Sequence, residues 1–190
     1  MGRDMLQLGQ RLRRSPEQKL VVGGASMGAA SAIYAAAHVH ADAAAAAPPP
    51  SPSPSPSPPS PPVISGLVLV IVPTFHEARE RRKGQIVAAA AKGIDAMKDN
   101  KRVRPIFKGT AREAEPPQPV GVRDDSFAHV MQGGAESDLP PPDTLRAALA
   151  ATPTLVLCWD CGDRTHPASS ARDLAAIAPH AVVHIAQSLK

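Results

Sequence analysis

The sequence predicts an α/β fold built on a parallel sheet, and three observations support this class. Two continuous apolar runs, at 66–73 and 154–159, are typical of strands that are covered on both faces. Helical patterns alternate with these runs, in the order expected of a doubly wound sheet. The length of 190 residues allows one ordinary domain. Only 3% of the residues are aromatic, so the core is expected to consist of Ala, Val, Ile and Leu.

The N-terminal part is predicted to form a helix, a strand and a second helix. Residues 2–14 are amphipathic, with their apolar side chains on one helical face. The run KLVVG at 19–23 is short, apolar and closed by glycine, which indicates a strand. The stretch 26–38 is rich in alanine, the strongest helix former, and is expected to be helical.

The later elements follow from the same patterns. The run GLVLVIVP at 66–73 predicts a buried strand, and a helix is expected over 75–98, where Gly84 and Gly93 can interrupt it. Residues 104–142 are polar and punctuated by proline, so no regular element is expected there. The last predicted elements are a helix at 144–150, a strand at 154–159, a helix at 169–177 and a strand at 181–185.

A low-complexity segment divides the chain. Residues 41–62 consist of alanines followed by PPPSPSPSPSPPSPP, which cannot build a packed core and is expected to be extended or disordered. We interpret it as an insertion between residues 1–40 and 63–190 of one domain, with a cap region at about 75–149. Its PxxP spacings also fit a ligand of a proline-recognising domain, and this alternative stays open.

Charge and hydropathy exclude several classes of function. The net charge of +4 comes partly from basic residues interleaved with Glu77 and Glu80, as on a solvated helix face. The basic cluster near Lys101 has no aromatic platform for stacking bases, so no nucleic-acid partner is predicted. No apolar run approaches the ~18 residues of a membrane span, and the first twenty residues lack the apolar core of a signal peptide. The predicted location is the cytoplasm.

The motif Gly24-Ala25-Ser26-Met27-Gly28 is the strongest chemical signal in the chain. It follows an apolar strand and opens an alanine-rich helix, which is the setting of a nucleophile elbow. The tight turn is expected to strain the backbone at the serine, and side chains in place of either glycine are expected to collide with neighbouring elements. The alternative is an ordinary glycine-rich turn in which Ser26 caps the helix.

Three blocks of the sequence resemble the α/β-hydrolase family. They are VVGGASMGAASAIYAA, GLVLVIVPTF and PTLVLCWDCGDRTHPASSARDLAAIAPHAVVHIA. In order, they are similar to the family's elbow strand and helix, its next sheet strand, and the strand that carries the catalytic acid. The resemblance covers somewhat under half of the chain and implies a partial α/β-hydrolase-like sheet with flanking helices.

By this resemblance, Ser26 is the nucleophile and the backbone N–H of Met27 is an oxyanion donor. Asp163 occupies the acid position of a G-x-x-D-x-x-x-P-like turn, and Asp160 is the alternative. Aspartate is also common in Gly/Pro turns that have no catalytic role.

The chain departs from the family pattern at the histidine base. The base normally follows the last strand, and by spacing it would fall beyond Lys190. His180 precedes the last predicted strand and His184 lies within it. His166 is a substitute base only with an unusual geometry, because it lies three residues from Asp163. The loop that supplies the second oxyanion donor and the strands before the elbow are also missing, so the chain is expected to be incomplete at both ends.

The resemblance implies a serine hydrolase acting on an ester or similar small acyl compound through an acyl-enzyme, without a cofactor or metal. Cys158 and Cys161 form a C-x-x-C, but no second ligand pair accompanies them. The alternative is a non-catalytic remnant or partial gene product that binds a partner. The sheet edge left by missing strands also makes an oligomer plausible.

Overall fold

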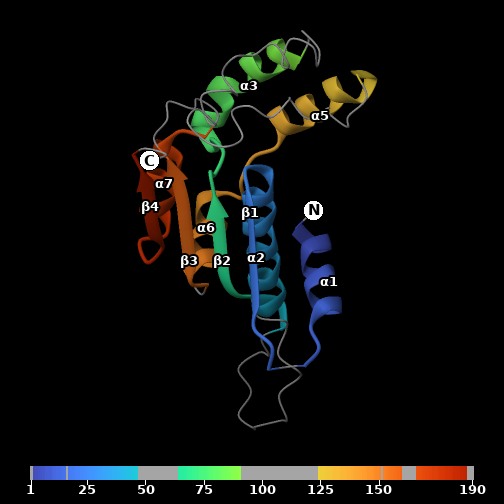
Figure 1. The fold of residues 1–190 in the computed structure, drawn as a ribbon, viewed down its shortest axis with the longest axis vertical. Coiled ribbons are helices and arrows are strands. Elements are labelled where there is room, and N and C mark those ends of the chain that lie inside the picture. Colours follow the sequence, from blue (N-terminus) through green and yellow to red (C-terminus); the bar gives the residue numbers. More distant parts are fainter. Residues whose placement is uncertain are drawn as a thin grey trace, which may run out of the picture. The chain divides into compact units, whose positions relative to one another are not determined.

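A computed structural model describes residues 2–15, 17–46, 64–90, 124–150, 152–159 and 166–187. The described strands form one parallel sheet in the order β1-β2-β3-β4 (Figure 1). Their bounds are Leu20–Ala25 for β1, Ile64–Val70 for β2, Thr154–Trp159 for β3 and Val182–Ala186 for β4. The predicted α/β class with a parallel sheet is therefore confirmed.

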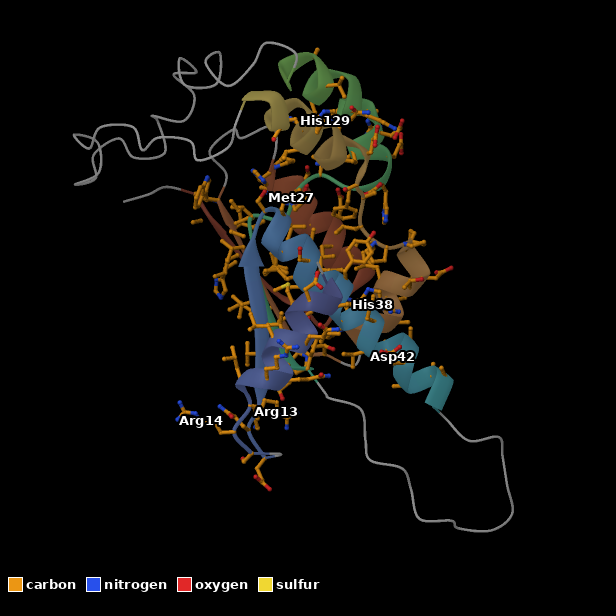
Figure 2. All side chains as sticks on the ribbon, turned by 90° about the vertical axis from the view of Figure 1, so that its right-hand side faces the viewer. Arg13, Arg14, Met27, His38, Asp42 and His129 are labelled. Carbon is orange, nitrogen blue, oxygen red and sulfur yellow. The ribbon has the colours of Figure 1, made fainter. Side chains whose placement is uncertain are left out.

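The helices of the sheet unit lie on one face of the sheet. In Figure 1, α2, α6 and α7 lie behind the strands and α1 lies beside α2; in Figure 2, which is turned by 90°, the helices lie to one side of the sheet. The bounds are Gly2–Leu12 for α1, Met27–Ala46 for α2, Pro142–Ala150 for α6 and Ala168–Ile177 for α7. Helix α1 approaches α2 closely at Gly2, where a Cβ would lie 2.8 Å from the Cβ of Tyr34.

The core lies between this helical layer and the sheet. Side chains on the helix face of the strands, such as Leu69 and Val156, are fully buried. The small alanines of α2 allow that helix to lie close to β1 and β2, with Ile33 buried among them. Burial of this aliphatic surface is the main source of stability, at about 25 cal/mol per Å² removed from water.

A second compact unit covers residues 75–138 and contains α3, His76–Ala90, and α5, Asp124–Glu136. These two helices pack against each other. The unit falls within the interval predicted as a cap, whereas α6 belongs to the sheet unit. The role of a cap stays a prediction.

Two sequence-based expectations about regular structure were wrong. Helix α5 lies within 104–142, where no element was expected, because its Gly133–Gly134 pair and flanking prolines outweighed its short apolar pattern. Helix α2 continues past His40 to Ala46, because the alanines at 41–46 favour a helix more than an extended chain. Residues 47–63, which contain the proline-serine repeat, lie outside the described residues.

Smaller differences concern where elements begin and end. Strand β2 ends at Val70, before the predicted end at Pro73, because the backbone turns at Ile71. Helix α3 runs through Gly84 without a break, and residues 91–98 of its predicted length lie outside the described residues. Within the described ranges, no helix combines the length and the apolar character needed to cross a membrane.

Candidate active site

Ser26 occupies the sharp turn between β1 and α2. Its φ of 54° lies in the left-handed region, which an L-residue other than glycine rarely adopts. The turn is fixed at both ends: the Ser26 N–H donates to the Val70 carbonyl at 3.0 Å, and the Ser26 carbonyl accepts from the Ala30 N–H at 3.1 Å. The serine side chain is thus held at the carboxyl end of the sheet, where open α/β sheets bind ligands.

The two glycines of the motif have different surroundings. A Cβ at Gly24 would lie 2.6 Å from the carbonyl carbon of Gly28, so the turn requires glycine there. A Cβ at Gly28 would meet nothing within 4 Å. The expected collision at the second glycine was therefore wrong, because that position faces open space on the first turn of α2.

The start of α2 presents backbone donors next to Ser26. Met27 is the first residue of the helix, and the first four N–H groups of an α-helix have no partner within it. These groups carry the positive end of the helix dipole, which favours an anion. Figure 2 shows Met27 at the N-terminal end of α2, and its side chain is exposed.

The structure brings His166 to Ser26 from 140 positions away in the chain. The ring Nε2 lies 2.7 Å from the Ser26 Oγ, and both side chains are half-buried. His166 precedes Pro167, the extended N-cap residue of α7, so the start of this helix anchors the histidine backbone. With the proton of a neutral imidazole on Nδ1, Nε2 accepts a hydrogen bond from the serine hydroxyl.

This arrangement can activate an oxygen nucleophile. As the hydroxyl oxygen attacks an electrophilic carbon, the imidazole nitrogen in hydrogen-bond reach takes up its proton. The distance of 2.7 Å lies within the 2.6–3.2 Å range of such pairs.

The other candidate histidines have surroundings of their own. Nε2 of His180 lies 2.6 Å from the Leu149 carbonyl oxygen, and His184 is an exposed residue of β4. Asp160 and Asp163 lie outside the described residues. Cys158 is buried in β3, and Cys161 lies outside the described residues.

Sequence reasoning missed Ile71, which directly follows β2. Its φ of 45° is in the left-handed region, and its N–H donates to the Leu157 carbonyl at 2.7 Å. A β-branched residue is the least suited to this conformation, so no sequence signal identifies the position. The register pairs Ala25 with Val70, which places Ile71 beside Ser26.

No family model matches the sequence, and no curated protein matches it. Among solved structures, a carboxylesterase of the ammonia-oxidizing thaumarchaeon Nitrososphaera gargenis is similar, with 13% identity and a TM-score of 0.51. A hydrolase from Pseudomonas aeruginosa PA01 is also similar, with 20% identity and a TM-score of 0.54. Each comparison covers 98% of this chain and 62% of the other, so the chain spans about three fifths of their length. The parallel sheet, the sharp turn between β1 and α2 and these similarities show that the chain has the α/β-hydrolase fold.

Proposed function

We propose that this chain is a serine hydrolase that cleaves esters or similar acyl compounds, with Ser26 as nucleophile and His166 as general base. The observation that carries the proposal is the distance of 2.7 Å between the His166 Nε2 and the Ser26 Oγ. The left-handed φ of Ser26 supports it, because strained backbone at a strand end is typical of functional sites.

The proposed reaction proceeds through an acyl-enzyme. The Ser26 oxygen attacks the acyl carbon while its proton moves to Nε2 of His166, and negative charge forms on the carbonyl oxygen. The Met27 N–H is the proposed donor to that oxygen. His166 then protonates the leaving alcohol as the ester bond breaks. Water, deprotonated by the same nitrogen, releases the acid and regenerates Ser26.

An acid beside His166 would hold the imidazole in the tautomer with its proton on Nδ1. Asp163 is the proposed residue, and Asp160 is the alternative; both belong to the segment that joins β3 to His166. The proposed base, His166, follows β3 and so differs from the family pattern, in which the base follows the last strand.

A fluorophosphonate that carries a small alkyl group tests the nucleophile. We expect intact-mass spectrometry of the purified chain to show a single covalent adduct, and Ser26→Ala to show none. Circular dichroism of both proteins establishes that they are folded.

Histidine variants test the base. We expect His166→Gln to slow labelling of Ser26 by roughly 10²- to 10⁴-fold, the usual contribution of a general base. His184→Gln is the matched control, because His184 is exposed on β4, and its labelling rate should equal that of the parent. Equal rates for the His166 and His184 variants would remove His166 from the mechanism.

A folded parent without any adduct would overturn the hydrolase proposal. The alternative, a non-catalytic chain that binds a partner, would then stand.

A further inference from the structure

Ile71 has a backbone conformation that its side chain disfavours. At a φ of 45°, the crowding that affects every L-residue is greatest for a side chain branched at Cβ. Glycine meets the same backbone requirement without this cost, and asparagine meets it at a lower one. The presence of isoleucine therefore calls for a reason other than the turn.

The surrounding structure holds this conformation in place. The Val70 carbonyl, one residue before, accepts the Ser26 N–H, and the Ile71 N–H donates to the Leu157 carbonyl on the other side. The next residue, Val72, is almost fully buried, with 2% of its surface exposed. The turn at Ile71 thus ends β2 and returns the chain to the core, while two neighbouring strands fix the backbone.

The order of the strands in the sheet places Ile71 next to Ser26 and His166. Ser26 follows β1, His166 follows β3, and β2 lies between these strands. Neighbouring strands lie about 4.8 Å apart, and Ile71 is next in register to Ser26. Its side chain is half-buried, so part of an aliphatic surface remains accessible beside the nucleophile.

We infer that Ile71 is a specificity-determining residue whose side chain forms an apolar wall beside Ser26 and contacts the acyl group of the substrate. The substrate class is therefore an ester with an apolar acyl chain rather than a polar or charged one. This inference rests on the proposed function. It explains why isoleucine occupies a position where the backbone alone favours glycine: the side chain is needed for contact with the acyl chain, despite its conformational cost.

Rates of covalent labelling with two fluorophosphonates, one with an ethyl and one with an octyl chain, test the inference. For the parent we expect faster labelling with the octyl reagent. Ile71→Gly fits the turn but removes the wall, and should lower the octyl-to-ethyl rate ratio by roughly 10-fold, the effect of lost apolar contacts at a specificity site. Ile71→Asn should lower it at least as much, and Ile71→Val should retain most of it.

Leu155→Ala is the matched control, because Leu155 is a half-buried aliphatic residue near the opposite end of β3. Its rate ratio should equal that of the parent. Thermal unfolding of each variant establishes folding, and Ile71→Gly should unfold near the parent temperature, because relief of the backbone strain offsets the lost apolar burial and the greater entropy of the unfolded chain.

The outcomes separate the two proposals. No labelling of the parent by either reagent overturns the proposed function and the inference with it. Labelling of the parent with an unchanged ratio in both Ile71→Gly and Ile71→Asn overturns the inference alone. Equal slowing of both reagents in those variants also overturns it, because Ile71 would then only support the turn at Ser26.

Discussion

Ser26 and its two flanking glycines show how differently two identical residues of one motif can be constrained. The backbone at Ser26 turns so sharply that the Cα of Gly24 faces the main chain of Gly28. There is no room for a methyl group at the first glycine, whereas the second has open space and lies within α2. Only the first glycine is therefore demanded by packing.

Replacing each glycine by alanine tests this difference. Gly24→Ala should destabilise the fold by about 2–4 kcal/mol, because the new Cβ meets backbone that cannot move without opening the elbow. Gly28→Ala, the matched control, should be neutral or stabilising by up to about 1 kcal/mol, because alanine favours the helix. Urea unfolding measures both, and equal losses in the two variants would contradict the assigned geometry.

At the scale of helices, α3 and α5 are joined through one arginine and one aspartate. Asp138 accepts the N–H of His76 at 2.8 Å and so caps the start of α3 from a distant part of the chain. Arg79, one turn later and 7% exposed, donates to the Gly134 carbonyl near the end of α5. Burial lowers the pKa of Arg79, and the Asp138 carboxylate offsets part of that shift.

Substitutions at Asp138 separate its two roles. Asp138→Ala should destabilise the α3–α5 pair by on the order of 2–3 kcal/mol, because it removes the cap and the negative charge near Arg79. Asp138→Asn keeps an acceptor and should lose less. Glu77→Gln, which breaks an exposed pair with Arg81, should change stability by about 0.5 kcal/mol or less.

Amide hydrogen exchange in the two helices measures these effects locally. If Asp138→Ala and Asp138→Asn exchanged at rates similar to those of Glu77→Gln, Asp138 would not join the helices.

At the scale of the whole molecule, the described helices of the sheet unit cover only one of the two faces of the sheet (Figure 2). The residues on this face form rows across the strands, and these rows contain no acidic residue, lysine or arginine. The rows are Gly23, Val68, Leu155 and Val182, and next Ala25, Val70, Leu157 and His184. From strand spacing and rise, the face covers on the order of 400 Å². Exposed apolar patches of a few hundred Å² are often interaction surfaces.

We predict that two copies of the chain associate weakly and transiently through this uncharged face, because its area is only about half of the ~800 Å² that each partner of a stable interface buries. Val21 lies two residues before Gly23 and so on the same face of β1. Val21→Lys with Val182→Lys should shift the association to higher concentrations, because both residues are exposed on this face, at 60% and 56%. Val130→Lys is the matched control, since Val130 is 58% exposed but lies on α5. Sedimentation velocity over a concentration series measures the effect. The assignment of this face as the contact between copies would be contradicted if the paired substitution left the association unchanged. It would also be contradicted if Val130→Lys weakened the association equally.

Local features of the sequence determined much of the fold. Strand β3 was predicted at its observed bounds, because a run of buried aliphatic residues carries its signal within six positions. The strained turn at Ser26 was predicted from five residues, since the glycines and the flanking strand and helix are all neighbours in the chain. Helix α5 was missed because contact with α3 stabilises it against weak local propensity.

The tertiary structure decided the site. The sequence offered His166 only as a substitute base that needs an unusual geometry, and its contact with Ser26 depends on β2 lying between β1 and β3. The same sheet order brings Ile71 next to the serine, and hydrogen bonds to both neighbours hold a backbone angle that no local pattern predicts. Chain-local propensities thus determined the elements, whereas the pairing of distant strands determined which side chains meet.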